Sequence, residues 1–380
     1  RSAALAMGRH DDTQYLEMKN DSEKLIHHRW GSNNSFNAIV GMDYTWHADQ
    51  SQKNGEPGYI WLDNARTRGR FKDGPRFDDT NVAGFNPCVE QQLEDAELCC
   101  LVETFPAKHE NLEDYLKTLK IAYLYGKTIT LSNTHWPETN AKMLKNRRIG
   151  LSQSGVVQAF NKHGRREMYN WCDQAYDFVQ SLDEEYSNWL CIPKSIRTTS
   201  IKPSGTVSLL NGSTPGIHFP EDEYYIRRIR FSKDSPLIGS LSEAGYKIED
   251  DVYSPNTVCV EFPVHEPYFV KGKRDVNMWE QLEIAAQYQH YWADNSVSIT
   301  VTFKPEEAPS IKDALEMYES RLKAVSFLRY EETGYEQAPY EPITKEQFEK
   351  MTNKITPVQR FETDQEGSGS KFCTNDTCTF

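Results

Sequence analysis

Strand-like and helical segments alternate along most of this chain, and the alternation constrains its fold more than any single motif. Apolar residues recur at helical spacing over 112–125, where Gly126 is a candidate C-cap, and β-branched residues at 128–131 predict a short strand. Residues 297–303 alternate apolar and polar side chains, and 310–322 predicts another helix. Strands alternating with helices over about 330 residues predict an α/β fold with a largely parallel sheet or barrel.

The composition excludes several classes of protein. The 380 residues are 38% hydrophobic and 12% aromatic, enough for a sizeable core, and no stretch reaches the roughly 18–20 apolar residues that span a bilayer. The 43 Lys and Arg residues against 56 Asp and Glu give a net charge of −13, which disfavours binding to DNA or anionic lipid. The 8 cysteines are too sparse for a secreted disulfide scaffold, and no secretory signal is visible. We therefore expect a cytoplasmic protein that binds neither DNA nor membranes.

A thiol, a carboxylate and a carboxamide alternate in the segment that carries the clearest chemistry. In an extended loop tip, Asn86, Cys88 and Glu90 would project to the same side. A neighbouring carboxylate raises the pKa of a thiol, so this setting is poor for a thiolate nucleophile. It suits a thiol that loses a hydrogen atom beside a carboxylate that takes a proton from a substrate hydroxyl. A buried cysteine in a proline-containing turn is the alternative interpretation.

Several separated motifs, taken in order, resemble one enzyme family. They are Asn-Pro-Cys-x-Glu-Gln at 86–91, Glu-Leu-Cys at 97–99, and the segments 56–66, 202–210, 213–218 and 224–230, followed by a terminal Cys-x4-Cys pair. Together they resemble the adenosylcobalamin-dependent (class II) ribonucleotide reductases, especially the monomeric ribonucleoside-triphosphate type. The resemblance implies part of a ten-stranded α/β barrel with a central finger loop. It also implies a catalytic portion at 1–355, lacking the N-terminal strands, and a flexible redox-active tail at 356–380.

The resemblance implies a role for each residue of the finger loop. Cys88 would be the thiyl-radical cysteine that removes the 3′-hydrogen of the ribose, Glu90 would accept the 3′-hydroxyl proton, and Asn86 would hold the substrate hydroxyls. Cys99 would belong to the dithiol that supplies electrons as water leaves C2′. A protein makes such a radical only by relaying one from a cofactor, and the resemblance alone implies that this cofactor is adenosylcobalamin. The substrate would be a ribonucleoside triphosphate and the product its 2′-deoxy form.

The terminal thiols and a small turn complete the predicted site. Cys373 and Cys378 follow a Gly/Ser linker at 366–370 and would re-reduce the active-site disulfide, themselves served by thioredoxin or a similar dithiol. A zinc ligand pair and an adventitious tail disulfide are the alternatives. The family's phosphate-binding loop corresponds to Ser204, Gly205 and Thr206, whose small side chains let a phosphate approach the backbone amides.

Other candidate residues receive weaker interpretations. Arg227, Arg228 and Arg230 either add positive charge near the substrate phosphates or form a solvated basic strand edge. His218 is a candidate for contact with the cofactor or substrate. Cys100, Cys172, Cys191 and Cys259 are interpreted as packing residues, and no histidine spacing typical of a metal site is found, so no metal site is predicted.

The sequence also departs from the family pattern. Enzymes of this family are substantially longer, and no cysteine precedes Cys88 to pair with Cys99. We therefore expect the C-terminal portion of the catalytic chain, which needs an N-terminal complementary segment and cannot complete the reaction alone. Three alternatives stay open: a reductase of the same fold whose radical comes from a metal-containing subunit, a non-catalytic nucleotide-binding fragment, and a thiol–disulfide oxidoreductase that uses the tail cysteines.

Overall fold

The computed structural model describes residues 4–21, 32–252, 254–330 and 336–358, which fall into two compact units. The first unit takes residues 1–220 and 266–332, and the second takes 221–265 and 333–380. The second unit was not anticipated within the predicted catalytic portion 1–355. The boundary of the tail stays a prediction, because residues 359–380 lie outside the described residues.

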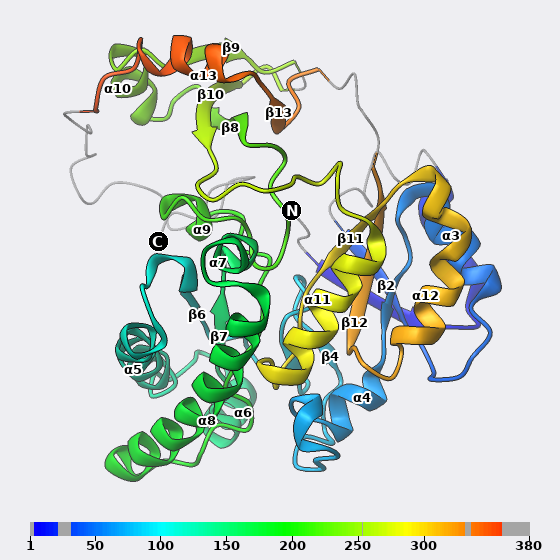
Figure 1. Ribbon diagram of the computed structural model, residues 1–380. Coiled ribbons are helices and arrows are strands. Elements are labelled where there is room, and N and C mark those ends of the chain that lie inside the picture. Colours follow the sequence, from blue (N-terminus) through cyan, green and yellow to red (C-terminus); the bar gives the residue numbers. More distant parts are fainter. Residues whose placement is uncertain (1–3, 22–31, 253, 331–335, 359–380) are drawn as a thin grey trace. The chain divides into compact units, whose positions relative to one another are not determined.

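The first unit contains most of the helices and strands (Figure 1). Its strands are β1 (Ala4–Arg9), β2 (Ser32–Asn37), β3 (Gly58–Ile60), β4 (Gly84–Phe85), β5 (Gln92–Leu93), β6 (Leu101–Thr104), β7 (Gly150–Gln153), β11 (Thr300–Phe303) and β12 (Ala324–Arg329). Its α-helices are α1 (Thr13–Leu16), α3 (Thr45–Asn54), α4 (Leu62–Thr67), α5 (Leu112–Ile129), α6 (Pro137–Asn146), α7 (Val156–His163), α8 (Arg165–Leu190), α9 (Val207–Leu210), α11 (Met278–Tyr291) and α12 (Ile311–Tyr318). Short 3₁₀ helices are η1 (Met18–Asn20), η3 (Phe71–Asp73), η4 (Pro106–Lys108) and η5 (Pro305–Ser310).

All strands of the first unit except β4 and β5, which pair with each other, form a connected wall. One sheet has the order β1-β2-β3-β12-β11, in which every pair is parallel except β3 with β12. Strands β6 and β7 form a parallel pair, and the bridges Leu151↔Thr199 and Ile201↔Val297 connect β7 by way of residues 199–201 to the segment that leads into β11. Parallel strands joined through helices confirm the predicted α/β class. Closure into a ten-stranded barrel stays a prediction.

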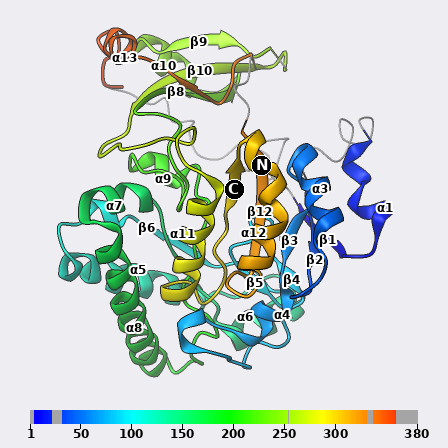
Figure 2. The ribbon, with the colours of Figure 1, turned by 45° about the vertical axis from the view of Figure 1, so that its right-hand side comes forward.

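The two faces of this wall differ in chemistry. The outer face carries apolar side chains such as Leu151, Val297 and Val301, which belong to one large core with the covering helices. Figures 1 and 2 show α5 and α8, two of these helices, lying side by side. On β7 and the segments next to it, the inner face carries glycine, serine and one lysine: Gly150, Ser152, Ser154, Ser200, Lys202, Ser296 and Ser298. On the five-stranded sheet, Ile60 and Ala324 pack with Val89 of the β4–β5 connection. The interiors of α/β barrels are usually filled by branched apolar side chains. Glycine and serine are smaller and leave room on this face for polar side chains, such as that of Gln91, which would lie 2.6 Å from a Cβ on Gly150.

Helix α5 corrects one prediction. It runs through Gly126 to Ile129, so Gly126 is not its C-cap and the predicted strand at 128–131 does not exist. A Cβ on Gly126 would lie 3.0 Å from Val102 Cγ2 and 3.3 Å from Ile149 Cγ2. Gly126 therefore serves close packing of the helix on the strand wall. The interpretation of Gly126 as the residue that ends the helix was wrong, since a glycine inside a helix is tolerated where packing requires it.

Two other predicted segments are found with altered ends. The predicted strand 297–303 is regular only over β11, although its first residues bridge to the neighbouring segment. The predicted helix 310–322 begins at Ile311 after a 3₁₀ turn and ends at Tyr318, where Glu319 is the C-cap. Among the described residues, no helix is long and apolar enough to cross a bilayer.

The second unit is an antiparallel sheet with the order β13-β8-β10-β9 and two helices. Its elements are β8 (Tyr224–Ser232), α10 (Leu237–Glu243), β9 (Lys247–Asp250), β10 (Thr257–His265), β13 (Tyr340–Pro342) and α13 (Lys345–Thr352). Arg228 pairs with Glu261 at 2.8 Å, and Arg230 pairs with Asp251 at 2.9 Å. The guanidinium of Arg227 lies 4.4 Å from the ring centroid of Tyr340. These arginines therefore stabilise their own sheet.

Candidate active site

A short hairpin places Cys88 at its tip. Strands β4 and β5 pair antiparallel, and residues 86–91 connect them. Asn86 closes the connection from both sides: its N–H donates to the Gln91 carbonyl at 3.0 Å, and its Oδ1 accepts the Gln91 N–H at 3.0 Å. The Val89 N–H donates to the Asn86 carbonyl at 2.9 Å, which makes residues 86–89 a turn.

The turn corrects the expected geometry of the tip. Val89 has φ 65°, a left-handed conformation that is unusual for a β-branched residue, so the tip is not extended. Simple alternation of Asn86, Cys88 and Glu90 toward one side does not apply. Glu90 and Asn86 are buried, whereas Cys88 stays half-buried with part of its side chain exposed.

Glu90 forms an ion pair inside the wall. Its Oε1 lies 2.8 Å from Nζ of Lys202, on the strand segment next to β7. Its Oε2 is buried and has no hydrogen-bond partner among the described residues. Burial lowers the pKa of Lys202, but the Glu90 carboxylate and, more weakly, the thiols of Cys88 and Cys99 raise it, and the net shift is upward. Glu90 therefore keeps one oxygen paired and one oxygen available as an acceptor.

The wall also fixes the backbone of the tip. The Ser298 hydroxyl donates to the Cys88 carbonyl, and the Ser296 N–H donates to the Glu90 carbonyl at 3.1 Å. Both serines lie on the segment that leads into β11. The tip is thus fastened to two strand segments, one through Lys202 and one through these serines.

Cys99 lies close to the same charges. It is exposed as a residue, yet surrounding atoms partly desolvate its thiol and, with the Glu90 carboxylate, raise its pKa. Lys202 and the Asn86 carboxamide oppose this rise. A raised pKa keeps the thiol protonated near neutral pH, which suits a donor of both electrons and protons. The structure thus brings Asn86, Glu90 and Cys99 into one neighbourhood.

The remaining cysteines of the described chain have other environments. Cys100 and Cys172 are buried, and burial raises their pKa to about 11 and about 12, as expected of packing residues. Cys259 is buried in the second unit. Cys191 is a correction, because it is exposed: it is the C-cap of α8 in a left-handed conformation, φ 53°, outside the core. Cys373 and Cys378 lie outside the described residues.

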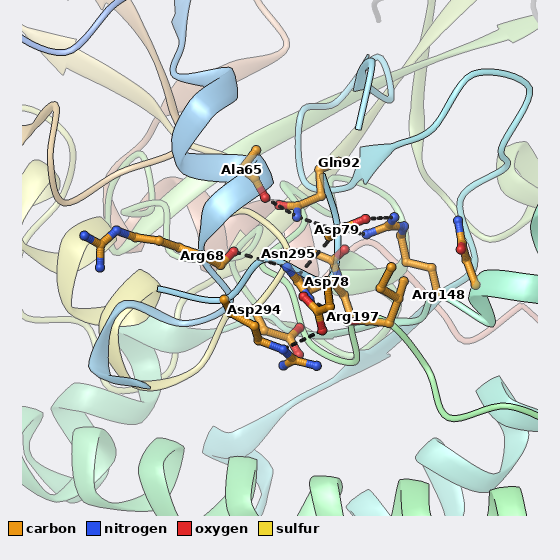
Figure 3. A network of polar contacts seen from close by, with 12 residues as sticks. Ala65, Arg68, Asp78, Asp79, Gln92, Arg148, Arg197, Asp294 and Asn295 are labelled. Carbon is orange, nitrogen blue, oxygen red and sulfur yellow. Dashed lines mark hydrogen bonds and ion pairs between the residues drawn. The ribbon is translucent and has the colours of Figure 1, made fainter. Parts of the chain in front are cut away.

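A buried network anchors the base of the hairpin (Figure 3). Gln92 Nε2, on β5, donates to Asp79 Oδ2 and to the Ala65 carbonyl, each at 2.8 Å. Arg148 forms a bidentate pair with Asp79, at 2.7 and 2.8 Å, and reaches Glu97 at 3.0 Å. Arg148 and its two partners have no exposed side-chain surface. Two parallel N–H···O bonds fix direction as well as distance, so the network orients β5 and the tip above it.

The predicted phosphate loop lies next to Lys202. Ser204 is buried, its N–H donates to the Lys202 carbonyl at 2.9 Å, and Thr206 is the N-cap position of α9. A Cβ on Gly205 would meet only the Pro203 carbonyl oxygen, at 4.0 Å, so the backbone there is open on one side. Backbone that a side chain does not cover is accessible to an anion.

His218 is held by hydrogen bonds at both ring nitrogens. Its Nδ1–H donates to the Pro215 carbonyl at 3.1 Å, and its Nε2 accepts the Thr300 N–H at 3.2 Å. Burial lowers its pKa to about 4. A neutral ring engaged on both sides ties the 213–218 turn to β11, so the interpretation as a contact for cofactor or substrate is not supported by this arrangement.

Sequence reasoning missed two charged residues of this site. Lys202 was noted only as part of the phosphate-loop motif, and Glu103 on β6 was not noted at all. Lys202 and Glu90 are far apart in sequence, so no local spacing indicates their pairing. Alternating Gly and Ser residues on successive strands were a usable signal, since they mark an inner face too polar for an ordinary core. No cluster of His, Cys, Asp or Glu that could hold a metal ion occurs among the described residues.

The chain is similar in sequence to several known enzymes. The chain is 46% identical to an adenosylcobalamin-dependent ribonucleoside-triphosphate reductase of Euglena gracilis, over 100% of this chain and 53% of that protein. It is 46% identical to a probable enzyme of the same name from Dictyostelium discoideum, over 100% of this chain and 51% of that protein. The identity with the Lactobacillus leichmannii enzyme is 38%, over 94% of this chain and 52% of that protein. No protein-family model matches the chain.

The fold of the chain is similar to that of solved ribonucleotide reductases. A B12-dependent (class II) ribonucleotide reductase superposes with a TM-score of 0.85 and 36% identity, over 93% of this chain and 54% of that one. The α-subunit of the Actinobacillus ureae class Id ribonucleotide reductase superposes with a TM-score of 0.62 and 15% identity, over 86% of this chain and 70% of that one, which shows likeness of fold alone.

The predicted resemblance to the class II ribonucleotide reductases and the predicted fold type are therefore confirmed. Within that class, the chain is homologous over its length to the adenosylcobalamin-dependent ribonucleoside-triphosphate reductases. It spans about half the length of these relatives.

Proposed function

We propose that this chain forms the catalytic part of an adenosylcobalamin-dependent ribonucleoside-triphosphate reductase. The reaction converts ribonucleoside triphosphates to 2′-deoxyribonucleoside triphosphates. One observation carries the proposal: a half-buried thiol, Cys88, and a buried carboxylate, Glu90, share the hairpin tip, and both act on the Lys202 ammonium, while Glu90 keeps one oxygen without a partner. The class of the relatives supports the same reaction.

The finger loop supplies the atoms for the first step. A radical at Cys88 sulfur takes the 3′-hydrogen atom of the ribose, and the free Oε2 of Glu90 accepts the 3′-hydroxyl proton. Lys202 holds the other oxygen, Oε1, in an ion pair at 2.8 Å, which fixes the direction in which Oε2 points. Asn86 Oδ1 accepts the Gln91 N–H with one lone pair, so its second lone pair and the NH₂ group are able to hold a substrate hydroxyl.

Cys99 supplies half of the reducing equivalents. Two thiols become one disulfide and release two electrons and two protons, while the 2′-hydroxyl leaves as water and hydrogen takes its place at C2′. Cys99 is one of these thiols, and its raised pKa keeps the needed proton on sulfur. Cys373 and Cys378 would re-reduce the disulfide by exchange and would be served in turn by thioredoxin or a similar dithiol.

The triphosphate would lie on the turn Ser204–Thr206. The open backbone at Gly205 supports this placement. Orphaned polar atoms of the lining, Ser200 Oγ and Ser296 Oγ, are buried without partners in the described part of the chain and suit a hydroxyl-rich ligand.

The cofactor fits the site in one testable respect. Cys88 keeps part of its side chain exposed, so a radical source as large as adenosylcobalamin is able to approach its sulfur. When bound, the cofactor supplies the radical that removes a hydrogen atom from that thiol. The protein's own part is to hold Cys88 at the hairpin tip and to hold Glu90 in its pair with Lys202.

Turnover of the full-length protein tests the proposal. With adenosylcobalamin, dithiothreitol and a ribonucleoside triphosphate, the wild-type protein should form the 2′-deoxy product, and Cys88→Ser should form none. Cys191→Ser is the matched control, because Cys191 is exposed and remote from the hairpin in the chain, and it should retain full activity. Product formed only when a metal-containing subunit replaces the cofactor would favour the same-fold alternative. Undiminished activity in Cys88→Ser would refute the radical role.

A further inference from the structure

Glu103 is a carboxyl group on the inner face of the wall that the proposed reaction does not use. On β6, the residue before it, Val102, contacts α5 at Gly126, and the residue after it, Thr104, hydrogen-bonds Tyr115 of α5 at 2.9 Å. Successive side chains of a strand point to opposite faces, so Glu103 points away from α5 and into the interior.

Glu103 is the acceptor for two serines of the neighbouring strand. Its Oε1 accepts the Ser152 hydroxyl at 3.1 Å and the Ser154 hydroxyl at 2.6 Å. Each serine oxygen in turn accepts a backbone N–H: Ser152 from Lys202 at 2.8 Å, and Ser154 from Gly216 at 3.0 Å. Since Glu103 takes both hydroxyl hydrogens, each serine oxygen turns its lone pairs toward a backbone donor.

The two backbone donors belong to the two turns beside the predicted phosphate loop. Lys202 carries the ion pair with Glu90 and leads into Ser204–Thr206, whereas Gly216 lies in the turn that His218 ties to β11. We propose that Glu103 is a positioning residue that holds the Lys202 turn and the Gly216 turn in place, so that a substrate triphosphate meets a preformed loop. Naming the triphosphate rests on the proposed function, whereas the coupling of the two turns does not.

The charge on Glu103 tunes this arrangement. Its pKa is raised to about 7 overall, and burial is the largest cause. The hydrogen bonds from Ser154 and Ser152 and the Lys202 ammonium act to lower this pKa, and the Glu90 carboxylate acts to raise it. Lys202 and Glu90 are the charged groups that act on it from the adjoining segment and from the hairpin. An ionised acceptor forms stronger hydrogen bonds than a neutral one, so the turns should be held more firmly above pH 7 than below it.

Glu103→Gln in the full-length protein tests the inference, because glutamine keeps the acceptor oxygen and removes the charge. The control is Glu138→Gln, the same change at an exposed position in the first turn of α6. We expect amide hydrogen exchange at Lys202 and Gly216 to rise about threefold to tenfold at pH 8 in Glu103→Gln, and to match wild type at pH 6. Ser154→Ala should speed exchange at Gly216 but not at Lys202.

Kinetics supply the second measurement. The KM for a ribonucleoside triphosphate should be about threefold higher in Glu103→Gln at pH 8, equal to wild type at pH 6, with kcat unchanged at both. Exchange at both turns that is unaffected in Glu103→Gln, or a wild-type KM that falls as pH is lowered through 7, would overturn the inference. Exchange needs no substrate, so a wild-type protein that reduces no triphosphate would count against the proposed function alone.

Discussion

At the scale of single residues, the account depends on the pair formed by Glu90 and Lys202. The pair joins the hairpin tip to a strand segment 112 residues away, and Glu90 is fully buried. A buried carboxylate is costly unless it is paired, and Lys202 supplies that partner for the carboxylate of the hairpin tip. The same ammonium lowers the pKa of Cys99, which makes its influence measurable without turnover.

Replacing Lys202 should therefore slow the alkylation of the Cys99 thiol. In Lys202→Met the Cys99 pKa should rise further, because the opposing positive charge is gone, and alkylation by iodoacetamide at pH 8 should slow by roughly threefold. Mass spectrometry of the labelled peptides gives the rate, and Cys191, also exposed, is an internal control whose rate should not change. An unchanged or faster rate at Cys99 would contradict the predicted field of Lys202.

Glu94 gives a prediction about pH and stability. Its carboxylate contacts Lys142 at 2.7 Å, Lys145 at 3.0 Å and Asn146 at 3.1 Å, and these partners outweigh desolvation and lower its pKa to about 2. Because the pKa is about 2 in the folded state and 4.5 in the unfolded state, ionised Glu94 stabilises the folded state fully at pH values above 4.5. This stabilisation is lost as the pH falls from 4.5 through about 2.

Glu94→Gln should consequently lower the free energy of unfolding most at neutral pH. Urea titrations at several pH values should show the difference from wild type shrinking between pH 4.5 and pH 2. Glu17→Gln, the same change at an exposed position away from Lys142 and Lys145 in the chain, should match wild type throughout. A difference that is independent of pH would mean that the loss comes from packing and not from charge.

At the scale of elements, the hairpin and α5 show where local patterns succeed and fail. Alternation of apolar and polar residues found β11, but it failed at the hairpin tip, because a left-handed Val89 and the Asn86 turn replace extended backbone there. Gly126 looked like a helix end, and only the positions of Val102 and Ile149 explain it. The motifs identified the family, whereas the contacts of Glu103 and Lys202 arise between strands that no local window contains.

Gly126 supports a prediction at the same scale. Gly126→Ala gains about 1 kcal/mol of helix propensity, but its Cβ would press on Val102 and Ile149, and overpacking costs about 1–3 kcal/mol. We expect a net loss of about 1 kcal/mol in urea unfolding. Gly239→Ala in α10 is the matched control, since nothing lies within 4 Å of its Cβ, and it should be neutral or stabilising. A stabilised Gly126→Ala would show that α5 has room to move.

At the scale of the whole chain, two compact units with separate sheets predict unfolding in more than one step. All 8 tryptophans fall at positions assigned to the first unit, so their fluorescence reports on that unit alone. In urea, the fluorescence transition should not coincide with the loss of hydrogen-exchange protection in peptides from β8 and β10 of the second unit. Coincident transitions would show that the two units unfold as one.

The most direct test of the central claim is the location of the radical. Electron paramagnetic resonance of the full-length protein, labelled with β-deuterated cysteine and mixed with adenosylcobalamin and a ribonucleoside triphosphate, should show a sulfur-centred signal that narrows on deuteration. The signal should persist in Cys99→Ser and vanish in Cys88→Ser. A signal that persists in Cys88→Ser, or whose width does not change on deuteration of cysteine, would contradict the assignment of the hairpin tip as the radical site.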